Sequence, residues 1–161
     1  MTTTYDFQDG NGPVPAHQHS NGGGWVADTA KVHETAYIGP DAKVFGNAEV
    51  IDYAKVDGNA KVSGHAKVSD YAKVYSNAEV SGNARVTGNA KVYGNAIVTG
   101  NASVYDNAKV FGNATIYESR FIDKPKISQW LQSVSIIESI PIMKLAIGSG
   151  VRSAIRFIIR S

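Results

Sequence analysis

The sequence contains no cysteine, only five prolines and no long hydrophobic run. Without cysteine the chain has no disulfide, thiolate nucleophile or thiolate metal ligand, and the redox state of its compartment stays open. Its most hydrophobic stretch is interrupted by Glu138 and Lys144, so it falls short of the ~18 apolar residues of a membrane span. Residues 1–7 lack the basic and then apolar order of a secretory signal. We therefore expect a soluble protein that is cytoplasmic or virion-associated.

Charge is small overall and unevenly distributed. The net charge is +2, yet residues 120–161 hold seven Lys and Arg against two Asp and Glu, while residues 1–119 hold nine against twelve. A length of 161 residues suits one domain with its own core. The basic residues at the end of the chain therefore indicate a segment that differs from the rest.

A repeat of six residues dominates the middle of the chain. An aliphatic residue returns every six positions, and alanine stands four residues after each of the first fifteen. Between them lie mostly glycine, asparagine and aspartate, which tolerate left-handed backbone conformations and tight turns. The aliphatic series is Val26, Val32, Ile38, Val44, Val50, Val56, Val62, Val68, Val74, Val80, Val86, Val92, Val98, Val104, Val110 and Ile116.

This period predicts a short strand followed by a corner. In each Ala-x-Val unit the alanine and valine are two apart and share one side of the strand, so both point inward. A six-residue unit cannot bury its own apolar face, hence units must coil, and three of them close a triangular turn of 18 residues. We expect an all-β solenoid, a parallel β-helix of about five turns over residues 26–119, between an N-terminal cap and loop (1–25) and C-terminal amphipathic helices (120–161).

The repeat resembles the hexapeptide-repeat superfamily. Residues 38–44, Ile-Gly-Pro-Asp-Ala-Lys-Val, have the spacing of that family's motif, although later units move glycine one place further along. The resemblance covers residues 26–116 and implies a left-handed β-helix, as in bacterial and prophage transferase-like proteins. Many members are acyltransferases that work as trimers, so the resemblance implies acetyl-CoA as a cofactor and a homotrimer as alternatives to a non-catalytic rod.

The N-terminal segment is rich in glycine and other turn residues. Residues 8–24 are expected to form a loop. With Phe7 and Trp25 as plugs, residues 1–25 would cap the first turn and protect its open strand edges. The pair His17 and His19 suggests half of a metal site, but few carboxylates and no cysteine stand nearby, so we expect no metal.

Helical periodicity replaces the repeat beyond Arg120. Apolar residues recur at helical spacing on both sides of Pro141. On the second helix Arg152, Arg156 and Arg160 lie four apart and form a basic stripe. Three interpretations stay open: solvated arginines on a helix that covers the last turn, contact with a membrane surface or anionic polymer, and an oligomer contact.

Residues 18 apart align in columns on the outside of the predicted β-helix. One column is all lysine, and the column beside it is largely aromatic. Such a face suits an anionic ligand or protein partner, with bases or sugars stacked on rings and lysine paired with anions. It is also compatible with plain solvent-facing strands or a subunit interface. The residues are Lys55, Lys73, Lys91, Lys109, Tyr75, Tyr93 and Phe111, preceded in the aromatic column by Asp57.

Catalytic signatures are sparse. Only His33 and His65 lie on the predicted β-helix, and neither has a carboxylate in its own column to orient it. We find no phosphate-binding glycine loop, nucleophile elbow or histidine set for zinc. The sequence therefore favours a non-catalytic scaffold or binding module of phage or bacterial type. The alternative is a CoA-dependent acyltransferase with His33 or His65 as base at a trimer interface.

Overall fold

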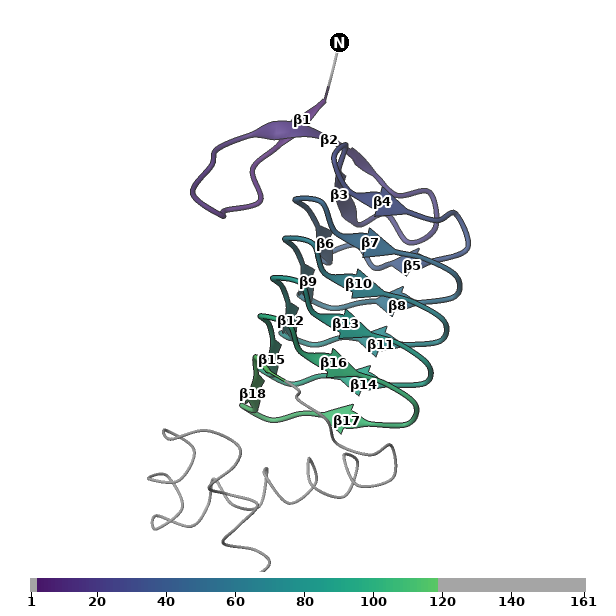
Figure 1. The fold of residues 1–161 in the computed structure, drawn as a ribbon. Helices are drawn as coiled ribbons and strands as arrows, with labels where there is room; N and C mark the ends of the chain where they lie inside the picture. Colours follow the sequence, from purple (N-terminus) through teal and green to yellow (C-terminus); the bar gives the residue numbers. More distant parts are fainter. Residues whose placement is uncertain (1–2, 119–161) are drawn as a thin grey trace, which may run out of the picture.

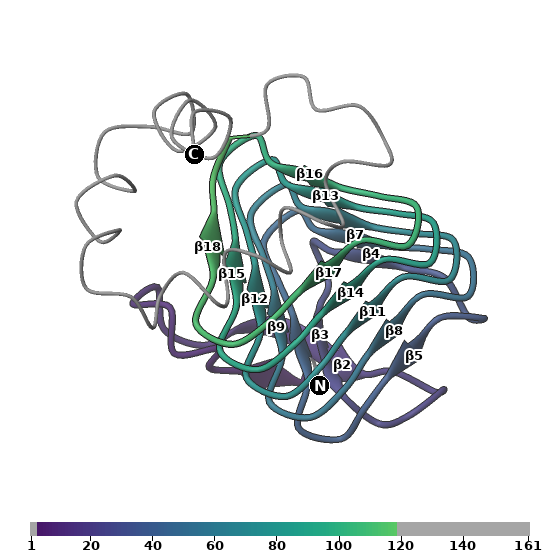
Figure 2. The same ribbon diagram turned by 90° about the horizontal axis from the view of Figure 1, so that it is seen from below.

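A computed structural model describes residues 3–118. The helices expected over residues 120–161, with Arg152, Arg156 and Arg160, lie outside the described residues. Of the eighteen strands in this range, the sixteen from β3 to β18 form a parallel β-solenoid of about five turns, and β1 and β2 pair antiparallel at its upper end (Figure 1). Seen along its axis, each turn is a triangle with one sheet on each side (Figure 2). Over residues 3–118, no helix is long and apolar enough to cross a bilayer.

Three sheets make the sides of the triangle. Sheet 1 has the order β1 (Thr4–Tyr5), β2 (Val14–Gln18), β3 (Trp25–Ala27), β6 (Lys43–Val44), β9 (Lys61–Val62), β12 (Glu79–Val80), β15 (Ile97–Val98), β18 (Thr115–Ile116). Sheet 2 has the order β4 (Lys31–Val32), β7 (Glu49–Val50), β10 (Lys67–Val68), β13 (Arg85–Val86), β16 (Ser103–Val104). Sheet 3 has the order β5 (Tyr37–Ile38), β8 (Lys55–Val56), β11 (Lys73–Val74), β14 (Lys91–Val92), β17 (Lys109–Val110).

The strand register confirms the 18-residue turn. Lys67 pairs with Glu49 on one side and Arg85 on the other, and the same offset recurs in all three sheets. Because the offset is constant, the inward alanines and valines of successive coils stack in one continuous core, where most have no exposed surface. Val32 and Ile116 are only partly buried, since they belong to the first and last coils.

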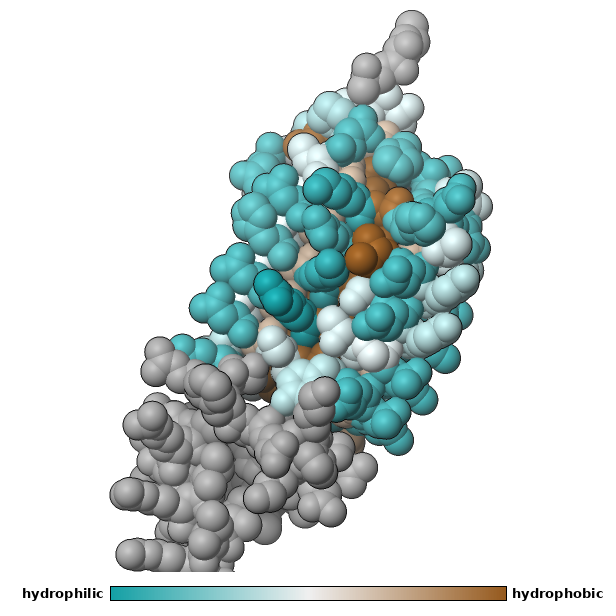
Figure 3. Space-filling view, turned by 45° about the vertical axis from the view of Figure 1, so that its right-hand side comes forward, coloured by the Kyte–Doolittle hydropathy of each residue, from teal (hydrophilic) through white to brown (hydrophobic). Residues whose placement is uncertain are grey.

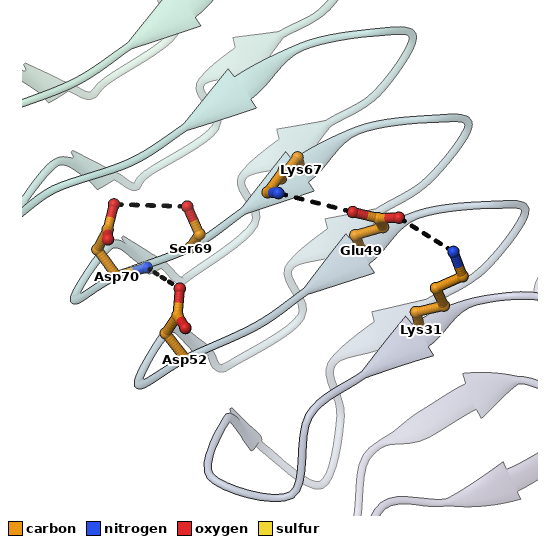
Figure 4. Close-up of polar contacts among 6 residues, drawn as sticks. All are labelled: Lys31, Glu49, Asp52, Lys67, Ser69 and Asp70. Atoms are coloured by element: carbon orange, nitrogen blue, oxygen red, sulfur yellow. Dashed lines mark hydrogen bonds and ion pairs between the residues drawn. The ribbon is translucent and has the colours of Figure 1, made fainter.

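From Gly46 to Gly112 each corner has a residue in the left-handed region, and glycine is the usual choice. At Gly82, φ is +64° and an added Cβ would lie 2.8 Å from the backbone nitrogen of Gly100 in the next coil. Asp52 and Asp70 adopt φ of 60° at one corner. Their carboxylates offset that strain, because each accepts a backbone N–H of the following coil. Asp70 N–H donates to Asp52 at 3.2 Å (Figure 4), and Gly88 N–H donates to Asp70 at 2.9 Å.

Asparagines after the corners form a second stabilising column. At the corner between sheets 3 and 1, each amide donates to the amide oxygen of the coil below, at 3.0 to 3.2 Å. The repeated Gly-Asn pair therefore does more than favour a turn: the asparagine also ties neighbouring coils together. The residues of this ladder are Asn59, Asn77, Asn95 and Asn113.

The N-terminal segment is not the simple loop expected for residues 8–24. It contains β2, which pairs antiparallel with β1 and with β3 and so covers the upper edge of sheet 1. Residues 19–24 cover the upper edge of sheet 3, where Ile38 donates to Asn21 O and accepts from Gly24 N, both at 3.0 Å. The expectation failed because glycine and proline signals surround a strand whose partner, rather than its composition, determines its conformation.

Phe7 and Trp25 do not plug the end of the solenoid core. Trp25 lies in β3 and points outward, where its ring stacks on Tyr5 with centroids 4.3 Å apart. Phe7 is 2% exposed and stacks on Phe45 at 5.0 Å. With Ala16 and Ala27 these rings form a small second core on the outer side of sheet 1. This cluster fixes the cap against the first two coils from outside.

Candidate anion-binding face

The outer side of sheet 3 carries a row of lysines, here called the lysine face. Lys73 lies in register with Lys55 above it and Lys91 below it, and Lys91 is in register with Lys109. Adjacent strands are ~4.8 Å apart, so the row presents one cation per coil along a straight line. The structure thus brings together the four lysines that the 18-residue columns predicted.

Acidic residues interrupt the corresponding rows on the other two sides. On sheet 2, Glu49 lies between Lys31 and Lys67, with Nζ to Oε distances of 3.4 Å and 3.8 Å (Figure 4). On sheet 1, Glu79 follows Lys61 and is itself followed by Ile97. Figure 3 shows one side of the molecule, whose described surface is mostly hydrophilic with a narrow hydrophobic strip. Within residues 3–118, sheet 3 alone has lysine in four successive coils of one column.

The uppermost lysine of the face is already neutralised. Lys55 Nζ lies 3.1 Å from Asp57 Oδ2 and 4.4 Å from the centre of the Tyr37 ring. Partial burial raises the pKa of Asp57, but the Gly58 N–H and the Lys55 ammonium outweigh it and bring that pKa below its usual value. The carboxylate is therefore ionised at neutral pH. Over residues 3–118, no carboxylate lies within ion-pair distance of Lys73, Lys91 or Lys109.

The aromatic column beside the lysines is a continuous ring stack. Tyr75 and Tyr93 have centroids 5.0 Å apart and planes at 3°, and Tyr93 and Phe111 are 5.3 Å apart at 12°. Tyr93 therefore has a ring on each face, and the column shows its edges and hydroxyls outward. Burial raises the pKa of Tyr75, and the neighbouring Tyr93 raises it further, so this phenol stays protonated and able to donate.

A second ring pair on the other flank of the lysines was missed in the sequence. Tyr53 and Tyr71 stack at 5.5 Å and 7° where the chain passes from sheet 2 to sheet 3. They are 62% and 59% exposed, so they are the most exposed large rings of this face. Their 18-residue spacing was a signal that could have revealed them. In one coil, Lys73 thus stands between Tyr71 and Tyr75.

The two solenoid histidines lie away from this face and apart from one another. His33 follows β4 and is exposed, with Nδ1 2.7 Å from Thr35 Oγ1. His65 is exposed at a corner between sheets 1 and 2, where its backbone N–H donates to Gly82 O at 2.8 Å. In the described coils no carboxylate contacts either imidazole. The two residues do not form one site.

The N-terminal histidines have separate structural partners. His17 is exposed and its Nδ1 lies 2.8 Å from Asp28 Oδ1. His19 is buried, and its Nε2 lies 3.1 Å from Ala36 O, a carbonyl that also accepts from the Asn21 amide at 3.0 Å. His19 therefore serves the cap at the upper edge of sheet 3. Over residues 3–118, no three potential metal ligands come together.

Comparison with known families agrees with the repeat seen in the structure. A family model described as the YdcK beta solenoid repeat matches residues 78–92 and residues 90–106. The matched stretch is similar to a β-solenoid repeat. It spans β12 to β16, in the fourth and fifth coils, and it contains Lys91 and Tyr93. No curated protein and no solved structure matches the chain.

Proposed function

We propose that the chain is a non-catalytic β-solenoid scaffold or binding module whose lysine face binds an anionic partner. The observation that carries the proposal is the row of Lys73, Lys91 and Lys109, which lack acidic partners in the described coils and are held in register by the backbone. Scaffold character follows from the solenoid itself, since each coil contacts only its neighbours and the row repeats without a break. From the resemblance we further propose a left-handed hexapeptide-repeat rod of phage or bacterial origin.

Electrostatics supports an anionic ligand on this face. Two like charges 4 Å apart repel by about 1 kcal/mol in water, and neighbouring lysines of the row are held at a similar spacing by their strands. An anion relieves this repulsion, whereas a second copy of the same face increases it. We therefore propose that a homotrimer, if formed, packs through sheet 1 or sheet 2 and leaves the lysine face accessible.

Charge reversal in the row tests the binding role. The double variant Lys73→Glu and Lys91→Glu is expected to lower affinity for a polyanion at least about tenfold and to reduce the slope of log K against log salt by about 2, because two cation contacts are lost. Fluorescence titrations with polygalacturonate, poly(dT) and polyphosphate at several salt concentrations measure both quantities, and circular dichroism checks the fold.

The double variant Lys43→Glu and Lys61→Glu is the matched control. It makes the same two changes at the same position of two successive coils, but on sheet 1. Its affinities are expected to stay within about twofold of those of the unmodified protein. The proposal fails if the unmodified protein binds none of the three polymers, or if the Lys73 and Lys91 variant binds them as the control does.

A CoA-dependent acyltransferase acting at a trimer interface is the second candidate. It is favoured by His33, whose Nδ1 is held by Thr35 while Nε2 has no partner in the described part and is accessible to act as a base. His65 is the other candidate base. This function predicts release of CoA from acetyl-CoA that falls at least about 100-fold in His33→Ala or His65→Ala. Absence of turnover with acetyl-CoA and varied acceptors would leave the non-catalytic function.

The basic end of the chain adds a further contact to this proposal. From the sequence we propose that Arg152, Arg156 and Arg160 contact an anionic surface such as a membrane or polymer. Together with the lysine face they would give the protein two cationic regions. The proposed setting is the cytoplasm or a virion.

A further inference from the structure

The accessible part of the lysine face begins at the coil of Lys73. In the coil above, Lys55 is paired with Asp57. Asp57 belongs to the same column as Tyr75, which lies one coil lower. Below it, Lys91 and Lys109 continue the row to the last complete coil of sheet 3. Three successive coils therefore offer a lysine flanked by an aromatic ring and no competing carboxylate.

The spacing of this row selects the shape of its ligand. The three ammonium groups project from strands ~4.8 Å apart along a straight axis. A ligand that meets each of them must be an extended chain with one anionic group per ~4.8 Å step. An extended chain of pyranose rings with one carboxylate on each ring repeats over about this length. Its successive carboxylates rotate about the chain axis, but the chain is thin, so the flexible stems of the lysines can reach each of them. Phosphates on one strand of duplex DNA follow each other at ~3.4 Å along the axis and wind around the thick duplex. They therefore turn away from a straight row of lysines after a few steps.

The ring stack argues against single-stranded nucleic acid. Sequence-tolerant binding of single strands depends on bases stacked on aromatic faces. Here Tyr93 is covered by Tyr75 on one face and by Phe111 on the other. Bases cannot enter this stack without separating rings that are fixed by the strand register. The column instead presents ring edges and the two tyrosine hydroxyls.

Neutral polar groups flank the cations on both sides. The hydroxyls of Tyr75 and Tyr93 lie on one side, and Asn89 and Asn107, both exposed, occupy the other flank below Tyr71. Hydroxyls and amides beside each charge fit a polyol that carries one charge per unit better than a densely charged polyphosphate. Tyr71 is the last ring of its pair and offers a ring face next to Lys73, against which one sugar can pack.

We infer that the lysine face takes an extended acidic polysaccharide along the solenoid axis, with one uronate unit per coil from Lys73 to Lys109. This inference rests on the proposed anion-binding function and names its ligand class. Each carboxylate pairs with one lysine, while the sugar hydroxyls meet the tyrosine hydroxyls and asparagine amides. The free face of the Tyr71 ring, on the side away from Tyr53, packs against the sugar between the levels of Lys73 and Lys91.

Oligogalacturonates of defined length provide the test, with oligo(dT) of equal charge and neutral dextran as comparisons, measured by isothermal titration on the full chain. Affinity for oligogalacturonate is expected to rise with length up to about three units and then level off, and to exceed the affinity for oligo(dT) at the same salt concentration.

Tyr71→Ala is expected to weaken uronate binding about fivefold and to leave the affinity for oligo(dT) unchanged. Tyr53→Ala, the matched control beside the neutralised Lys55, is expected to change uronate affinity less than twofold.

Asp57→Asn tests the upper limit of the site. The change releases Lys55, so the length at which uronate affinity levels off is expected to increase by one unit. Stronger binding of oligo(dT) than of uronate, or a length limit that Asp57→Asn does not move, would overturn the polysaccharide inference while leaving the anion-binding function in place. Loss of binding to every polyanion would instead reject the proposed function itself.

Discussion

Deletion of residues 1–24 is expected to make the protein associate through its first coil. The deletion removes β2 from the edge of β3 and removes the bonds that Asn21 and Gly24 make with Ile38. Val26 and Ile38, which have no exposed surface in the intact protein, would then face solvent beside two unpaired strand edges. Such edges pair readily with other strands. Light scattering after size-exclusion chromatography is expected to show at least twice the mass of the full chain at equal concentration.

The control for this deletion is Asp9→Ala. Asp9 lies in the exposed turn between β1 and β2. Within residues 3–118 its carboxylate accepts hydrogen bonds only from Asn11, from the backbone N–H and from the side-chain amide, both at 3.0 Å. Its replacement leaves both covered edges intact, so the mass in solution is expected to equal that of the unmodified protein. An unchanged mass and thermal midpoint for the deletion would show that the N-terminal segment does not protect the strand edges.

A charge inside the prism is expected to have the largest effect on stability. Val68 is fully buried, between Val50 and Val86 of the coils above and below. Val68→Asp places an unpaired carboxylate in an apolar column and is expected to lower the free energy of unfolding by more than about 4 kcal/mol. Domains of this kind have about 5–15 kcal/mol in total. Urea titration followed by circular dichroism is expected to show loss of most β structure without denaturant or at low urea.

The neighbouring residue supplies a control for the core variant. Lys67 is adjacent to Val68 but faces outward, and its Nζ is 3.8 Å from Glu49 in an exposed ion pair. Such pairs contribute about 0–1 kcal/mol, so Lys67→Gln is expected to change the urea midpoint little. Equal midpoints for Val68→Asp and the unmodified protein would contradict an interior built from stacked valines.

The solenoid could be predicted because the repeat itself encodes it. Valine and alanine return at fixed spacing, and a turn of three units, or 18 residues, places them all inside in register, as Val50, Val68 and Val86 show. The lysine row followed from the same arithmetic, since residues 18 apart share a column. Side-chain periodicity therefore specifies both the core and the surface rows.

The cap could not be predicted in the same way. Residues 14–18 have no apolar alternation, and β2 exists because the edge of β3 is available to it. The role of Phe7 depends on the distant Phe45, a contact that no local pattern reveals. The pairing of Lys55 with Asp57 was within reach, because residues two apart share one side of a strand. The 18-residue columns do not reveal this pair, because both residues belong to the same coil.

The constant 18-residue offset between paired strands also limits how this gene can change in length. Insertion or loss of 18 codons within the repeat adds or removes one whole coil, so every later side chain keeps its side of the prism and the lysine row grows or shortens by one. A change of six codons preserves the buried valines but shifts all later residues to the next side. Lineages that retain the row are therefore expected to differ in steps of three repeat units.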